Sequence, residues 1–215
     1  MQRLHDAIEQ YNASRTRFWD DDYNTLLAAG PAEPAQIERL QALEPRPLPA
    51  DLVQFYRRFG GLHNQDNTES YCMELPLPGQ LADGLEAANA YLRIRSLGLV
   101  DMIAHSWGND RPEFAAGGAF SQAELDELNG RYRCYGWYRT DTVLESAWYL
   151  YADPDGRFGA LLYDQDRFDR TARELRALLA ASPAGQSLED ALCEGVERMH
   201  ATMIEWCDED ADEDA

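Results

Sequence analysis

The chain has 215 residues, 45% of them hydrophobic, which is enough apolar material for one sizeable domain. Its 39 acidic and 19 basic side chains give a formal net charge of −20, which disfavours nucleic acid and anionic lipid as ligands and favours a basic protein partner. The first residues lack a basic start followed by an apolar run, and no stretch approaches about 20 uninterrupted apolar residues, so we expect a cytoplasmic protein without membrane association.

Four cysteines are widely scattered along the chain, and none shows the paired spacing of a zinc ribbon or a disulfide framework. They are Cys72, Cys134, Cys193 and Cys207. A metal site that combined two of them with His63 and His105 would need four distant segments to converge. We therefore expect reduced packing cysteines, no metal and no cofactor.

The first 35 residues are predicted to be a helical extension that packs on the body of the protein. Apolar residues recur at helical spacing at its start: Leu4, Ala7, Ile8 and Tyr11. The three carboxylates of residues 20–22 suit the positive N-terminus of a second helix. This short helix would run through Leu26 and Leu27 and end at Gly30.

Two helices joined by a proline-rich connector are predicted next. Residues 36–44 have helical spacing, and residues 51–59 place four apolar side chains on one helical face: Leu52, Phe55, Tyr56 and Phe59. Three prolines within residues 45–49 require an extended connector between the helices. Gly60 and Gly61 end the second helix as a C-cap.

The middle of the chain alternates short predicted elements with irregular segments. Residues 71–77 predict an edge strand, because Pro76 cannot donate to a central ladder. A helix is predicted over 85–100, followed by irregular chain over 103–114. The Ser-x-x-Glu spacing that begins at Ser121 predicts the capping box of a further short helix.

The stretch 131–166 predicts an antiparallel meander of three strands, because three runs of aromatic and branched residues are separated by polar turns. Residues 140–142 form the first turn. The second turn, Asp153-Pro154-Asp155-Gly156, combines a preset proline, an aspartate that can bond its own backbone and a glycine for the left-handed position. Large side chains lie on both faces of the middle strand, so helices should cover at least one face.

Two helices and a tail are predicted to follow. The first helix ends at Ser182-Pro183, and the last spans 187–206 with apolar residues three or four apart: Leu188, Leu192, Val196, Met199, Met203 and Trp206. Residues 207–215 are predicted to be a disordered acidic tail. These elements give an α+β fold, in which an antiparallel or mixed sheet with a central three-stranded meander is flanked by helices.

The order of these pieces resembles the SUKH superfamily, which contains the Smi/Knr-type proteins. The resemblance rests first on Ile37-x-x-Leu40-x-x-Leu43-Glu44 and on Leu48-Pro49-x-Asp51-Leu52-x-x-Phe55-Tyr56-x-x-Phe59-Gly60-Gly61. Later features are the Asp155-Gly156 turn, the run Leu162-Tyr163-Asp164 and a final helix. The resemblance covers residues 36–206 and implies one α+β domain.

In bacteria, the resemblance implies an immunity protein without catalytic activity, which binds and neutralises a polymorphic toxin. Eukaryotic relatives resemble adaptors or regulators, and this second function stays open. A hydrolase that uses the segment His105 to Glu113 is a third, because an imidazole and two carboxylates lie within nine residues there.

The toxin is expected to be basic, since a net charge of about −14 remains when the six carboxylates of residues 208–215 are left out of the −20. Acidic side chains presented by loops and turns are then the candidate partner-binding residues. They are Asp110, Glu113, Asp153, Asp155, Asp164 and Asp166.

Overall fold

A computed structural model describes most of the chain. The described residues are 1–19, 22–65, 72–107, 114, 119–140, 145–181 and 185–213, the last seven by backbone alone.

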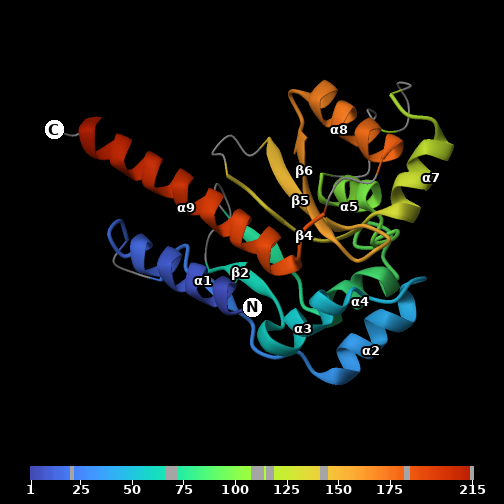
Figure 1. Ribbon diagram of the computed structural model, residues 1–215, viewed down its shortest axis with the longest axis horizontal. Helices are drawn as coiled ribbons and strands as arrows, with labels where there is room; N and C mark the ends of the chain where they lie inside the picture. The colour runs from blue at the N-terminus through green and yellow to red at the C-terminus, as the bar shows by residue number, and fades with distance from the viewer. Residues whose placement is uncertain are drawn as a thin grey trace.

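Eight helices and one six-stranded antiparallel sheet make up this part of the chain, and the predicted α+β class is confirmed (Figure 1). The helices are α1 (Gln2–Arg15), α2 (Pro34–Leu43), α3 (Ala50–Phe59), α4 (Pro78–Glu86), α5 (Leu99–Ser106), α7 (Gln122–Arg131), α8 (Phe168–Ala180) and α9 (Leu188–Glu213). The strands are β1 (Leu26–Ala28), β2 (Leu62–Asn64), β3 (Met73–Leu75), β4 (Arg133–Tyr138), β5 (Ser146–Ala152) and β6 (Phe158–Asp164). Spatial order follows sequence order from β1 to β6, and the sheet is open.

The predicted meander is present as β4, β5 and β6. Its second hairpin is regular from Ser146 opposite Asp164 to Ala152 opposite Phe158. Gly156 has a φ of +74°, the left-handed conformation that the turn sequence predicts. Side chains directly opposite each other share a face, so these strands define the two surfaces of the sheet.

Helix α9 packs on the first of these surfaces, α3 contacts α9, and α1 lies along α9 (Figure 1). This face carries Met73, Tyr138, Trp148 and Leu162. Gly195 permits the close approach, because a Cβ there would lie 2.9 Å from the Met73 Cε and 3.1 Å from the Tyr138 ring. A larger residue at this position would push the helix off the sheet.

Helices α5 and α8 cover the second surface over β4, β5 and β6. An aromatic cluster fills this layer, with the Tyr163 ring 5.2 Å from the Trp107 ring and 5.9 Å from the Phe114 ring. Coverage stops before β2 and β3, where His63 and Glu74 are exposed. The second surface is therefore partly open to solvent.

The expected helix through Leu26 and Leu27 is wrong, because these residues form the edge strand β1. Asn24 has a φ of +59°, which no helix tolerates, and Leu26 and Leu27 then pair with Asn64 and His63 of β2. The three residues of β1 are too few for a stable helix, and pairing with β2 satisfies their backbone hydrogen-bonding groups instead.

Side chains of two helices and the backbone of one loop residue occupy both outer edges of the sheet. On β1, the Asn12 amide of α1 donates to the Leu26 carbonyl and accepts from the Leu26 N–H, both at 2.9 Å. On β6, the Thr171 hydroxyl bonds the Leu162 carbonyl and the Asp164 N–H, and Gln186 pairs with Phe158. These contacts protect edges that would otherwise present free backbone groups.

The middle of the chain departs from its predicted elements. Strand β3 is third in the order rather than at an edge, because β1 and β2 extend the sheet beyond it, and Pro76 lies just after the strand. The helix predicted over 85–100 is wrong: Pro78 begins α4 seven residues earlier than that helix, and α4 ends at Glu86. His105, expected in irregular chain, lies in the last turn of α5.

The remaining predicted helices are confirmed, with one extension. α2, α3, α7 and α8 lie where expected, and α7 begins with the predicted capping box of Ser121 and Glu124. Helix α9 does not stop at Trp206 but continues to Glu213, so the predicted disordered tail is helical that far. No glycine or proline follows Gly195 to end the helix sooner.

Candidate functional site

Three segments that are far apart in the sequence meet around one cleft of about 600 Å³. They are the proline connector before α3, the turn between β5 and β6, and the start of α9, and we call the hollow the connector–turn cleft. Its lining residues are 46–51, Arg133, Tyr135, 152–157, Ser187 and Asp190. These segments carry the resemblance to the SUKH superfamily, together with the apolar spacing of the helices.

The connector is held in its extended form by the side chain of Gln41 in α2. The Gln41 amide donates to the Arg46 carbonyl at 3.1 Å and accepts from the Leu48 N–H at 2.7 Å. At the end of the connector, the Asp51 carboxylate accepts a hydrogen bond from the Leu188 N–H at 3.3 Å. The first turn of α3 thus also caps α9.

The turn is organised by Asp153, which is 8% exposed. One of its carboxylate oxygens accepts hydrogen bonds from the N–H groups of Asp155 and Arg157, both at 2.9 Å. Gly156 then approaches the connector, since a Cβ at this glycine would lie 3.6 Å from Pro49. Asp155 is left exposed at the rim of the cleft.

A buried ion pair lies under the cleft. The guanidinium of Arg133 and the carboxylate of Glu44 are 3.1 Å apart, and Arg133 also donates to the Asn129 carbonyl. Burial raises the pKa of Glu44, while Arg133 and Arg46 oppose that shift. Burial likewise raises the pKa of the Tyr135 phenol, which stays protonated at neutral pH.

The third wall of the cleft is the capped N-terminus of α9. The Ser187 hydroxyl donates to the Asp190 carboxylate at 2.6 Å and accepts from the Asp190 N–H at 3.1 Å. Asp190 also forms an ion pair with Arg3 of α1. The hydrogen bond from Ser187, followed by the contact with Arg3, holds the pKa of Asp190 below its ordinary value.

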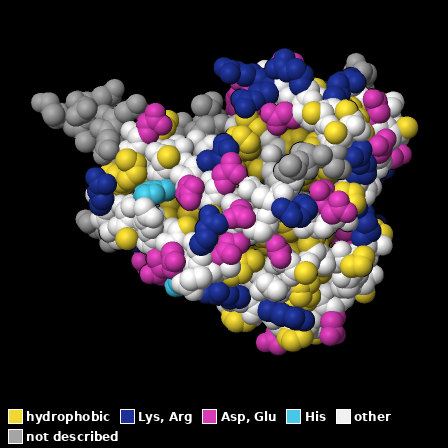
Figure 2. Space-filling view, viewed as in Figure 1, with side chains coloured by type: hydrophobic (Ala, Val, Ile, Leu, Met, Phe, Trp, Pro, Cys, Tyr) yellow, Lys and Arg dark blue, Asp and Glu magenta, His cyan; other side chains and the backbone are white. Residues whose placement is uncertain are grey.

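The cleft therefore presents carboxylates toward solvent above a buried ion pair, and the exposed guanidinium of Arg157 shares its rim. Asp155 is exposed, and the side chain of Asp190 is 41% exposed despite its ion pair. Acidic and basic side chains alternate over the face that carries α1 and α9 (Figure 2). Such a rim can bind a guanidinium or ammonium group of a protein partner. In the described ranges, no three His, Cys, Asp or Glu side chains converge as ligands for a metal ion.

The structure separates the six predicted partner-binding residues. Asp153 and Asp155 lie together at the cleft, but the Asp153 carboxylate faces the turn backbone. Asp164 ends β6 and Asp166 follows it, about 20 Å away along a seven-residue strand, and Asp164 accepts from the Arg167 N–H. The other two predicted residues, Asp110 and Glu113, fall outside the described residues, as does most of the segment from His105 to Glu113.

The sequence prediction did not include Asp51 and Asp190 among the site residues. Both follow recognisable signals, because Asp51 begins the helix after the connector and Asp190 is the fourth residue of a Ser-x-x-Asp capping sequence. These signals identify helix starts. Only the folded chain shows that the two helix starts meet beside Asp155.

Comparisons with protein-family models, with curated proteins and with solved structures give no match for this chain. None of the helices in the described ranges is both long and apolar enough to cross a membrane. The SUKH resemblance thus stays a prediction from the sequence motifs.

Proposed function

We propose that this chain is a non-catalytic immunity protein that binds a cognate basic toxin and occludes its active site. The observation that supports this function best is the connector–turn cleft, where three segments of the SUKH-like pattern meet under exposed carboxylates. In this proposal Asp155 and Asp190 contact basic side chains of the toxin. Asp153 acts indirectly by holding Asp155 in place.

Electrostatics supports a basic partner. Toxins that act on nucleic acids or nucleotides hold phosphates with basic residues, so an acidic surface can occupy the same electrostatic field as the substrate. The net charge of −20 would speed the encounter, and the rim carboxylates would fix the contact. Because exposed charges are screened beyond about 8 Å at physiological salt, the contacts at the rim should decide affinity.

The blocked sheet edges favour binding through side chains. A partner strand could not add at Leu26, whose backbone groups bond Asn12, or at Phe158, which pairs with Gln186. A partner that binds side chains at the cleft would not need to displace any of these edge contacts.

The test begins with the genes beside this one, among which we expect a gene for a large secreted protein. We expect its variable C-terminal domain to co-purify with this chain and to lose its toxicity when bound. A neighbouring gene for a regulator, together with no toxin in the vicinity, would favour the adaptor function instead.

Binding to that toxin domain is then measured across a salt series. We expect Asp155→Asn and Asp190→Asn each to weaken binding about tenfold, with association slowing as salt rises. Asp166→Asn is the matched control, because Asp166 is also exposed but lies at the far end of β6. Equal affinity for all three variants, or indifference to salt, would overturn the acidic-rim mechanism.

A further inference from the structure

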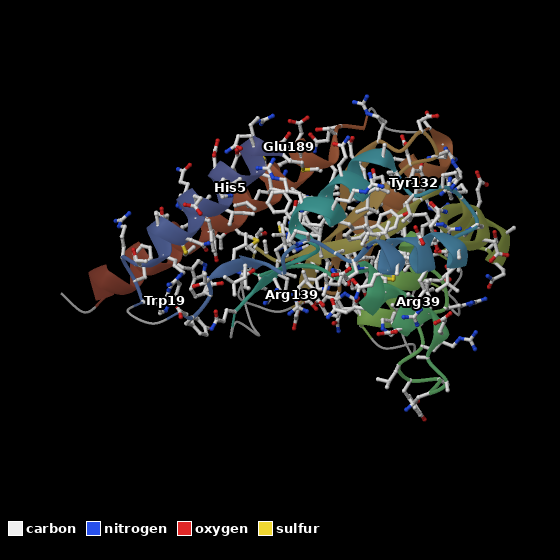
Figure 3. The ribbon with its side chains drawn as sticks, turned by 90° about the horizontal axis from the view of Figure 1, so that it is seen from below. His5, Trp19, Arg39, Tyr132, Arg139 and Glu189 are labelled. Carbon is white, nitrogen blue, oxygen red and sulfur yellow. The ribbon has the colours of Figure 1, made fainter. Side chains whose placement is uncertain are left out.

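The segment between α4 and α5, residues 87–95, projects from the molecule as a ridge, which we call the 87–95 ridge. Figure 3 shows this green loop extending from the side of the molecule opposite to Glu189. Tyr91 is 89% exposed and Leu92 is 65% exposed. These are the two most exposed large hydrophobic side chains among the described residues. Adjacent apolar side chains with this exposure mark an interaction surface.

The ridge is held in one conformation by its own contacts. The Tyr91 N–H donates to the Asn89 side chain at 2.9 Å, and the Ile94 N–H donates to the Gly84 carbonyl at 2.9 Å. Ile94 is buried against Gly84, where a Cβ would lie 2.5 Å from the Ile94 Cδ1. The exposed residues are therefore presented in a fixed position, which lowers the entropy lost on binding.

The charge of the ridge is opposite to that of the chain. Arg93 and Arg95 are exposed, and neither forms an ion pair with a residue that the structure describes. Nearby, the Arg139 guanidinium lies 5.0 Å from the Trp137 ring and 5.6 Å from the Trp107 ring. The ridge itself thus carries two arginines and no carboxylate in a chain of net charge −20, although Asp101 and Glu74 line the hollows beside it.

A hollow lies on each side of the ridge. The first, about 500 Å³, lies beside Arg93 and Arg95 and reaches His105 and Asn129. The second, about 400 Å³, lies beside Leu92 and reaches Trp137 and Arg139 on the open part of the sheet surface. A partner that straddled the ridge would fill both hollows and bury Tyr91 and Leu92 between them.

We propose that the 87–95 ridge is a second interaction surface, which binds an acidic protein segment carrying apolar side chains. Carboxylates of that segment pair with Arg93 and Arg95, and its apolar side chains pack on Tyr91 and Leu92. Arginine and tyrosine are the residue types that dominate binding energy at protein interfaces. The proposal does not depend on the immunity function, because the connector–turn cleft lies on the other side of the molecule.

The test is a selection of random peptides, about 12 residues long, displayed on phage against the whole protein. We expect selected peptides to combine Asp or Glu with Leu, Ile or Phe. A synthetic copy of the strongest peptide should bind the double variant Arg93→Glu/Arg95→Glu and the variant Tyr91→Ala at least tenfold more weakly than the unchanged protein. The controls are Arg57→Glu/Arg58→Glu, which makes the same charge change at exposed positions of α3, and Leu43→Ala, which truncates an exposed hydrophobic side chain of α2.

Four results would overturn the proposal. The selected peptides could lack acidic residues, or they could bind the ridge variants and the control variants equally. Tyr91-dependent binding to vesicles of phosphatidylglycerol and phosphatidylcholine, without peptide binding, would assign the ridge to a lipid surface. Self-association in sedimentation experiments that Arg93→Glu/Arg95→Glu abolishes, again without peptide binding, would assign it to a second copy of the chain.

Discussion

Asp153 and Asp155 perform different tasks although they are separated by one proline. The carboxylate of Asp153 is buried and bonds two backbone N–H groups of its own turn. Asp155 uses only its N–H in that arrangement and leaves its carboxylate at the rim of the cleft. A carboxylate can therefore contact a partner only where the fold leaves part of it exposed.

This division of tasks predicts opposite outcomes for the two residues. Asp153→Ala leaves two turn N–H groups without their acceptor, and we expect the free energy of unfolding to fall by about 1–3 kcal/mol in urea titrations. Asp153→Asn keeps one acceptor oxygen and should lose less. Asp155→Asn should stay within about 0.5 kcal/mol of the unchanged protein. A loss of stability in Asp155→Asn equal to that in Asp153→Ala would contradict the assignment.

At the scale of elements, Asn12 stands in for a seventh strand at the β1 edge. Its amide offers one donor and one acceptor to Leu26, as a neighbouring strand would. We expect Asn12→Ala to lower the free energy of unfolding by about 1–2 kcal/mol and to raise light scattering from concentrated solutions. Gln10→Ala, an exposed change on the same helix, is the control. Unchanged scattering and stability in Asn12→Ala would show that the edge needs no such cover.

The N-terminal part of α9 should weaken in acid. Hydrogen bonds from Ser187 and from Arg198 lower the pKa values of Asp190 and Glu194, respectively. The folded state then binds fewer protons than the unfolded state near pH 4, so this stability is present above the ordinary pKa values and is lost as pH falls through the folded ones.

We expect the free energy of unfolding to decrease from about pH 5 to about pH 3, and to decrease less in the double variant Asp190→Asn/Glu194→Gln. The comparison with the unchanged protein is needed because the raised pKa of Glu44 makes the folded state more stable as pH falls, which is the opposite effect. An identical slope for the two proteins across this pH range would rule out these carboxylates as the source.

Local sequence signals were sufficient to predict the elements that have regular apolar spacing and recognisable capping or turn residues. The helices α2, α3, α7 and α8 and the hairpin of β5 and β6 follow from such signals. Strands β1 and β2 have three residues each, and their existence depends on pairing with each other. The helix predicted over 85–100 was misplaced because its apolar residues do not form one continuous helix face. Ile94 is buried and anchors the ridge, and the last residues of that range begin α5.

The candidate site was predictable only in part, for a physical reason. The turn sequence identified Asp153 and Asp155, but nothing local distinguishes a carboxylate that binds its own backbone from one that faces solvent. Asp190 became a site residue only because α9 begins beside that turn. The 87–95 ridge was hidden by the helix expected over 85–100, which included all of its residues.

At the scale of the whole molecule, net charge is a poor description of the surfaces that partners meet. The connector–turn cleft presents carboxylates, whereas the 87–95 ridge presents arginines on the side away from Glu189 (Figure 3). If both proposals hold, a basic protein and an acidic segment can bind at the same time. The chain would then bridge two partners, as the adaptor function requires.

The arrangement around β1 also determines where this protein can safely be shortened. A product of proteolysis that lacked residues 1–35 would lose β1 and the Asn12 amide together, and the backbone of His63 in β2 would become the new outer edge. Copies of such a fragment could pair edge to edge and grow into insoluble fibrils. The first thirty-five residues would then serve the solubility of the whole chain, as a built-in guard against polymerisation.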